Sequence, residues 1–238
     1  MVTIGNRFLV AHFLYPLLAL GVISVGITSV DVDRSLADYF YSIQGGEWAW
    51  ENSWLAETFF HKGGRFASVL LVLAVLVLSI VAQLNQLLMP HKKPLLYLLL
   101  ATAGGSLLVS VFKSLLAVSC PWEFERYGGH LLYTGVVEQI FLRNGEGCFP
   151  AGHASAGYAW VSAYFFGVYY QSKWRWLGLV IPLLAGMVLG LVQQIRGAHF
   201  ISHDVWSLAV CWFFSFGLFY VFFKSPSEKL AAPDLICQ

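Results

Sequence analysis

Six apolar runs, each close to the length that crosses a lipid bilayer, constrain this sequence more than any other feature. A spanning helix needs roughly 20 apolar residues, because each residue adds about 1.5 Å and the hydrocarbon is about 30 Å thick. The runs cover residues 8–30, 66–84, 94–118, 154–171, 176–195 and 205–223. They predict an all-α polytopic membrane protein, in which one domain, 1–238, forms a bundle of six transmembrane helices.

The composition supports a membrane protein and excludes nucleic acid as a partner. Of the 238 residues, 58% are hydrophobic and only 11% are charged, whereas about 25% of residues are charged in soluble domains. The formal net charge is +1 and the 14 Lys and Arg residues are scattered. A nucleic-acid-binding protein needs a concentrated basic face. The lipid bilayer is therefore the expected partner.

The joints between the runs favour one orientation in the membrane. With a cytoplasmic N-terminus, the outer segments are 31–65, 119–153 and 196–204, and the inner ones are 85–93, 172–175 and 224–238. The short inner joints carry Lys92, Lys93, Lys173 and Arg175, which fits the positive-inside rule. The longer outer segments carry as many Lys and Arg residues as the inner ones, so the orientation rests on the short joints. We expect 31–65 to be a periplasmic, interfacial segment rich in Trp, and 224–238 to be a short cytoplasmic tail.

Ionisable residues gather at the ends of the runs on the outer side. The joints that follow odd-numbered runs all fall on one side, so three segments that are distant in sequence converge there. They bring together Lys113, Arg126, His153, Arg196, His199, His203 and Asp204. Ionisable groups at a membrane are costly unless they are paired or functional. Cations, imidazoles and a carboxylate on one face suit an anionic substrate.

Phosphate chemistry fits this set. Lys113, an arginine and the backbone N–H groups near Gly152 are suitable donors to phosphate oxygens. One histidine, oriented by a carboxylate, can attack phosphorus while a second protonates the departing alkoxide. Singly, these residues also have structural explanations, since Lys113 can snorkel from a helix end and Arg196 can anchor at the interface.

A metal site is the competing interpretation. His199 and His203 are four residues apart, a spacing that places two imidazoles on one helix face, and Asp204 is adjacent. No HExxH motif surrounds them. We therefore expect no metal.

At these residues the sequence resembles the type 2 phosphatidic acid phosphatase superfamily of integral-membrane lipid phosphatases. The family motifs read approximately K-x6-RP, PSGH and SR-x5-H-x3-D. This sequence has Lys113-x6-Cys120-Pro121, Pro150-Ala-Gly-His153 and a variant third motif ending Gly197-Ala-His-Phe-Ile-Ser-His-Asp204. The resemblance covers about residues 60–223, and Gly-Ala-His-Phe-x-Ser is most similar to the branch that contains bacterial lipid A phosphatases.

The resemblance implies hydrolysis of a phosphate ester through a phosphohistidine, without metal or other cofactor. His199 would be the nucleophile, Asp204 would orient its imidazole, and His153 would be the general acid. Lys113 and Gly152 would bind the phosphate.

The sequence departs from the family motifs at two arginines. Cys120 replaces the arginine of the first motif, and Arg126 is the candidate to take over its role. Gln193 stands where the third motif has an arginine, and Arg196 is the candidate there.

The aspartate of the third motif is displaced as well. His203 occupies its position and Asp204 follows one residue later, so either side chain is a candidate partner of His199. A carboxylate stabilises an imidazolium better than a second imidazole does, which favours Asp204.

Cys120 and Cys148 lie in the same outer segment, where an oxidising compartment favours a disulfide. The bridge would tie the first motif to the second and stabilise the fold by roughly 3–4 kcal/mol. Two free thiols are the alternative.

These inferences predict an enzyme of a bacterial inner (plasma) membrane with its site facing the periplasm. It would hydrolyse a phosphomonoester or pyrophosphate on a lipid of the lipid A, undecaprenyl pyrophosphate or phosphatidylglycerophosphate class. The alternatives are a lipid-to-lipid phosphotransferase, or a non-catalytic lipid-binding or transport protein on the same fold.

Overall fold

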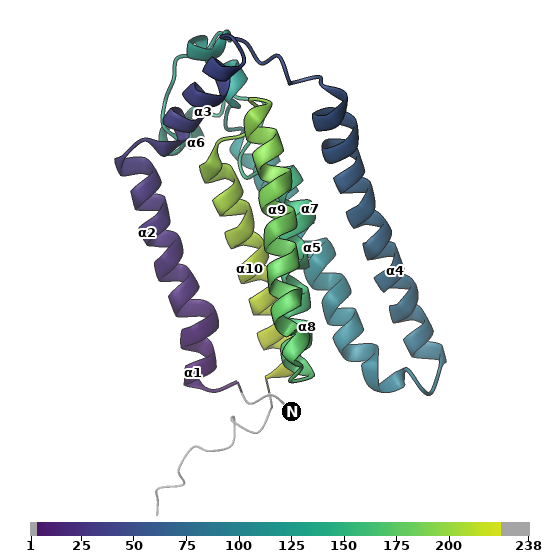
Figure 1. The fold of residues 1–238 in the computed structure, drawn as a ribbon. Helices are drawn as coiled ribbons and strands as arrows, with labels where there is room; N and C mark the ends of the chain where they lie inside the picture. Colours follow the sequence, from purple (N-terminus) through teal and green to yellow (C-terminus); the bar gives the residue numbers. More distant parts are fainter. Residues whose placement is uncertain (1–3, 225–238) are drawn as a thin grey trace, which may run out of the picture.

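The computed structural model describes residues 4–224, and its regular structure is helical. Long helices run side by side as a bundle, and short helices and loops cover one end of it (Figure 1). The α-helices are α1 (Asn6–Leu9), α2 (Tyr15–Ser29), α3 (Val32–Ile43), α4 (Gly64–Leu84), α5 (Lys92–Leu116), α6 (Val136–Leu142), α7 (Gly152–Tyr158), α8 (Ser162–Tyr169), α9 (Leu177–Ile195) and α10 (Ile201–Phe223). Shorter π or 3₁₀ segments are η1 (Val10–Leu14), η2 (Leu55–Gly63), η3 (Met89–His91), η4 (Pro121–Glu123), η5 (Glu125–Tyr127), η6 (Ala159–Val161) and η7 (Lys173–Trp176).

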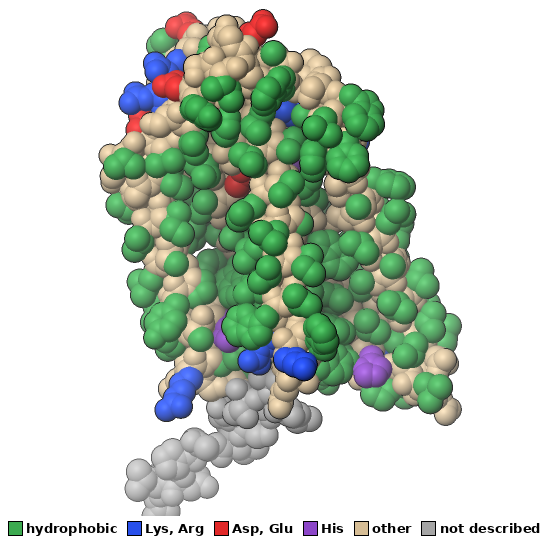
Figure 2. Space-filling view, viewed as in Figure 1, with side chains coloured by type: hydrophobic (Ala, Val, Ile, Leu, Met, Phe, Trp, Pro, Cys, Tyr) green, Lys and Arg blue, Asp and Glu red, His purple; other side chains and the backbone are tan. Residues whose placement is uncertain are grey.

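Within the described residues, five helices are long and apolar enough to cross a membrane. They are Asn6–Ser29, Leu55–Leu84, Met89–Glu123, Lys173–Ile195 and Ile201–Phe223. Exposed apolar side chains cover the sides of the bundle, whereas charged side chains gather toward its two ends (Figure 2). The prediction of an all-α polytopic membrane protein is confirmed at this level.

The predicted run 154–171 is helical but is not among the five spans. It forms α7, η6 and α8 in succession, and Ala154, Ala159 and Phe165 are all 0% exposed. This broken helix packs against α5, α9 and α10. It therefore forms the centre of the bundle, whereas five of the six predicted runs form helices of spanning length.

Glycines bring α7 and α9 into direct backbone contact. A Cβ atom on Gly157 would lie 2.3 Å from the backbone nitrogen of Gly186, and one on Gly186 would lie 2.1 Å from the ring of Tyr158. Small residues of this kind allow membrane helices to approach each other closely. This contact holds α7 at a fixed depth beside α9.

The segment 31–65 covers one end of the bundle. Ala37 of α3 packs with Phe124, Tyr127 and Phe200 in a small apolar core, and Asp33 accepts a hydrogen bond of 2.9 Å from the backbone N–H of Ser202. The segment thus rests on the loops that carry the sequence motifs. The rest of the predicted tail 224–238, beyond Lys224, lies outside the described residues.

Candidate functional site

Two histidines from different parts of the chain meet at the covered end of the bundle. His153 lies in the first turn of α7, and His199 lies in the joint between α9 and α10. The centroids of their rings are 6.3 Å apart. The joint turns sharply at Gly197, whose φ of 74° lies in the left-handed region that favours glycine. A Cβ atom there would also lie 2.4 Å from the ring of Trp48.

His199 is buried and its pKa is depressed. Its side chain is 3% exposed, and this burial holds the pKa of His199 well below its ordinary value. The neighbouring His203, Lys113 and His153 lower the pKa further. Burial and like charges both disfavour a protonated imidazole. His199 is therefore held in the neutral form, which is the form that has a free lone pair.

Lys113 comes to the same place from the last turn of α5. Its stem passes Gly152, where a Cβ atom would lie 3.8 Å from the lysine Cδ, and a Cβ atom on Gly147 would lie 2.9 Å from the lysine carbonyl oxygen. Glycine at position 147 lets the loop before α7 approach the end of α5, whereas at position 152 the distance is an ordinary van der Waals contact. Lys113 and His153 consequently line one cavity.

The predicted disulfide between Cys120 and Cys148 is present. The Cα atoms are 5.2 Å apart, and the bridge links positions 28 residues apart in sequence. The backbone N–H of Cys148 also donates a hydrogen bond of 2.7 Å to the carbonyl of Val118. The bridge ties the segment after α5 to the segment before α7, and thereby ties the neighbourhood of Lys113 to that of His153.

His203 and Asp204 have different neighbours although they are adjacent in α10. His203 is 0% exposed, and its ring centroid lies 5.7 Å from that of His199. Asp204 is 5% exposed and accepts a hydrogen bond of 2.6 Å from Nε2 of Gln194 in α9. A Cβ atom on Gly190 would lie 2.4 Å from that carboxylate. His203 thus lies beside His199, and Asp204 binds to α9.

The two arginines singled out from the sequence form ion pairs within the protein. Arg126 makes two hydrogen bonds of 2.6 Å to the carboxylate of Asp38. This pair lowers the pKa of Asp38 and raises the pKa of Arg126. Both side chains are partly exposed, so the pair ties the loop after α5 to α3 at the surface.

Arg196 is 7% exposed and donates to three acceptors. These are the carbonyl of Glu51 at 2.7 Å, Oε1 of Gln193 at 3.2 Å, and the carboxylate of Glu57. Its guanidinium holds the segment before α4 against the end of α9. Neither Arg126 nor Arg196 lines the cavity that contains Lys113 and His153.

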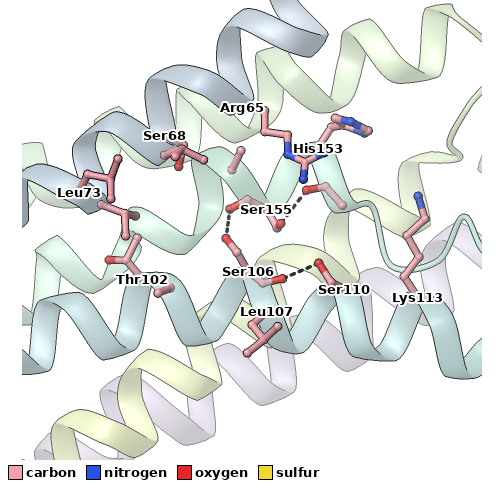
Figure 3. A pocket seen from close by; sticks show the side chains of 15 residues that line it. Arg65, Ser68, Leu73, Thr102, Ser106, Leu107, Ser110, Lys113, His153 and Ser155 are labelled. Atoms are coloured by element: carbon pink, nitrogen blue, oxygen red, sulfur yellow. Dashed lines mark hydrogen bonds between the residues drawn. The ribbon is translucent and has the colours of Figure 1, made fainter. Parts of the chain in front are cut away.

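This cavity contains an arginine that the sequence analysis did not single out. The space, of about 420 Å³, lies between α4, α5 and α7. Arg65, in the first turn of α4, lines it together with Lys113 and His153. The guanidinium of Arg65 lies beside His153, and Lys113 lies on the opposite side of His153 in this view (Figure 3). Successive runs cross the membrane in opposite directions, so the start of run 66–84 is expected at the same end as the other site residues.

The three candidate metal ligands from the sequence are divided between two places, because His203 lies beside His199 whereas Asp204 binds to Gln194 of α9. In residues 4–224, the group of three potential ligand atoms that lie within 4.8 Å of one another belongs to Cys120, Glu123 and Cys148. The disulfide uses both sulfur atoms of that group. His199, His203 and Asp204 form no such group among the described residues.

Comparison with known protein families assigns most of the helical bundle to a family. The model of the PAP2 superfamily matches residues 94–227, which contain both histidines, Lys113 and the disulfide. No curated protein and no solved structure matches the chain.

Proposed function

Because the chain belongs to the PAP2 superfamily, whose members are mostly phosphatases, we propose that it hydrolyses a phosphomonoester or pyrophosphate carried by a membrane lipid. Family membership implies phosphatase-type chemistry on phosphate esters. The span-length helices support a substrate that resides in the membrane, because its apolar part can stay in the bilayer.

The separation of His153 and His199 carries this proposal. Reacting atoms stand about 3–3.5 Å apart in a productive geometry. Two rings with centroids 6.3 Å apart can therefore contact one phosphoryl group from either side. The neutral state of His199 meets the requirement of a nucleophile, which needs its lone pair.

The reaction proceeds in two steps. The lone pair of His199 attacks phosphorus, the bond from phosphorus to the lipid oxygen breaks, and His153 donates a proton to that oxygen. The lipid alcohol, or the lipid monophosphate from a pyrophosphate, leaves. His153 then removes a proton from water, whose oxygen attacks phosphorus and releases inorganic phosphate, and His199 is regenerated.

Lys113 neutralises charge on the phosphoryl oxygens, and the backbone N–H of Gly152 donates to them. His203 and Asp204 are assigned positioning roles. His203 packs beside His199, and Asp204 fixes the start of α10 through Gln194.

We further propose that α7 to α8 acts as a sixth membrane segment and that the site faces the periplasm of a bacterial inner membrane. The basic joints 85–93 and 172–175 at the opposite end support this orientation. Lipid A, undecaprenyl pyrophosphate and phosphatidylglycerophosphate represent the proposed substrate class.

The deciding experiment incubates the purified protein with a panel of these lipid phosphates and follows the phosphorus. Release of inorganic phosphate supports the hydrolase. Phosphate on a second lipid identifies a transferase, and no reaction across the panel contradicts the proposed enzyme. A His199→Ala variant purified in parallel serves as the blank.

A further inference from the structure

The cavity between α4, α5 and α7 is lined by two cations and by no carboxylate. Arg65 and Lys113 both line it, and His153 is the remaining ionisable side chain in the lining. Among the residues that the structure describes, no acidic group lies within ion-pair distance of Arg65 or Lys113. Arg126 and Arg196, by contrast, are occupied by Asp38 and Glu57.

Arg65 and Lys113 carry like charges and line the same cavity, so an anion placed between them is attracted to both. The cavity therefore favours a ligand with at least two negative charges. A terminal phosphate carries such a charge near neutral pH, and its three free oxygens can accept from both side chains.

The first motif of this chain supplies no arginine to the cavity. Cys120 occupies the arginine position of that motif and is bonded to Cys148, so it offers no donor. Arg65 is placed beside His153 from a different helix (Figure 3). An arginine fits this role because its planar guanidinium can hold two phosphate oxygens at once.

We propose that Arg65 is the second phosphate-binding cation of this site, and that the substrate is a lipid with a terminal phosphate that lies between α4 and α5. This inference rests on the proposed function. It assigns to α4 a contact that the resemblance assigns to the segment after α5.

The rest of the cavity extends along α5, away from Lys113. Its wall on α5 runs from Lys113 back to Thr102, a distance of about 16 Å at 1.5 Å per residue. Val69, Leu73 and Leu107 line the part away from the charges. The charged end thus receives the phosphate. The part of the lipid next to it meets apolar side chains and also the hydroxyl groups of Ser68, Thr102, Ser106, Ser110 and Ser155.

The test compares Arg65→Gln, Arg65→Lys and Lys62→Gln with the wild type in detergent micelles, using a lipid phosphate that the wild type hydrolyses. Lys62 is a matched control, because it lies one turn away, pairs with Glu57 at 3.2 Å and does not line the cavity. We expect Arg65→Gln to lower kcat/KM by about 100-fold, the usual effect of removing one donor to a developing charge. Arg65→Lys should restore part of that loss, and Lys62→Gln should stay within about threefold of the wild type.

Arg65 makes no ion pair with the described residues, so its loss should leave the melting temperature within about 2 °C of the wild type. A kcat/KM of Arg65→Gln within about threefold of the wild type overturns the inference. Failure of Arg65→Gln to fold, or an equal loss in Arg65→Lys together with a lowered melting temperature, also overturns it, because either result indicates a structural role.

Orthovanadate binding, followed by thermal shift, separates this inference from the proposed function. If the wild type binds vanadate but hydrolyses no lipid, the hydrolase proposal fails on its own. The phosphate-binding role of Arg65 is then tested by comparing the vanadate affinity of Arg65→Gln with that of the wild type. A loss of about tenfold or more in Arg65→Gln supports the phosphate-binding role, whereas unchanged affinity, or no binding by the wild type, overturns it.

Discussion

Asp204 accepts a hydrogen bond of 2.6 Å from Nε2 of Gln194, and this bond ties the first turn of α10 to the last turn of α9. The carboxylate is buried against Gly190. Asp204 could support His199 in two ways. It could contact the imidazole directly, or it could hold α9, the helix that precedes His199.

Asp204→Asn distinguishes these roles. An asparagine keeps an oxygen that can accept from Gln194 but removes the negative charge. If Asp204 positions α10, kcat should fall by no more than about tenfold, whereas loss of a carboxylate that stabilises an imidazolium costs about 10⁴-fold. Steady-state kinetics measure the difference. Asp204→Leu, which also loses the hydrogen bond, should be the more severe variant and should lower the melting temperature.

His199→Gln should abolish both phosphate release and the phosphoenzyme. The neutral imidazole supplies the electron pair of the bond to phosphorus, and an amide cannot replace it. Rapid acid quench with ³²P-labelled substrate measures the intermediate. A labelled protein that survives in His199→Gln would show that another residue is the nucleophile.

His153→Gln should slow hydrolysis in a way that depends on the leaving group. A general acid contributes about 10²–10⁴-fold when the departing oxygen needs a proton. The leaving group of a nitrophenyl phosphate ester departs without a proton, so the loss of activity on this substrate should be much smaller. Equal losses on alkyl and nitrophenyl esters would contradict the role of general acid.

The protonation state of His199 should differ from that of an ordinary histidine. Burial, together with His203 and Lys113, lowers its pKa from the usual 6.5, so the ring should remain neutral as the pH falls through that value. Histidine-selective ¹⁵N NMR of the protein in micelles reports the charge of each ring, with His199→Gln as the assignment control. A His199 signal that titrates near pH 6.5 would contradict the prediction.

Reduction of the disulfide should destabilise the protein. The bridge between Cys120 and Cys148 spans 28 residues, for which loop-closure entropy gives about 3–4 kcal/mol. The thermal midpoint of the wild type should fall on addition of a reductant. The midpoint of the Cys120→Ser/Cys148→Ser double variant should already be low and should not respond.

The pair Asp38–Arg126 should give stability a specific pH dependence. Its hydrogen bonds lower the pKa of Asp38 in the folded state, so the stabilisation is present above the unfolded pKa of about 3.9. It is lost as the pH falls through the lower, folded value. The unfolding free energy, measured between pH 3 and 6, should therefore be less sensitive to acid in Asp38→Asn than in the wild type.

Hydropathy was sufficient to predict most of the fold, because the need for about 20 apolar residues is a local property that a sequence states directly. Alternation of the runs then brought His153 and His199 to the same end, and a shared outer segment indicated the disulfide. The division of run 154–171 by η6 was not predicted, since its residues are as apolar as those of the continuous helices.

Side-chain partners were the part that the sequence could not predict. Arg126 and Arg196 were candidates because they lie near the motifs, but Asp38 and Glu57, which pair with them, come from segments far away in sequence. Arg65 stands beside other basic residues at the start of an apolar run, and only the packing of α4 against α5 makes it part of the cavity.

The backbone contact between Gly157 and Gly186 implies a sharp difference in mutational tolerance along one helix. In a saturation library scored for function, position 186 should accept glycine alone, since any added carbon meets the ring of Tyr158. Ile181 and Leu184, which are 61% and 53% exposed on the same helix, should accept most apolar replacements. Substitutions can therefore accumulate on the exposed side of α9 during evolution, while the distance between the two histidine-bearing segments stays fixed.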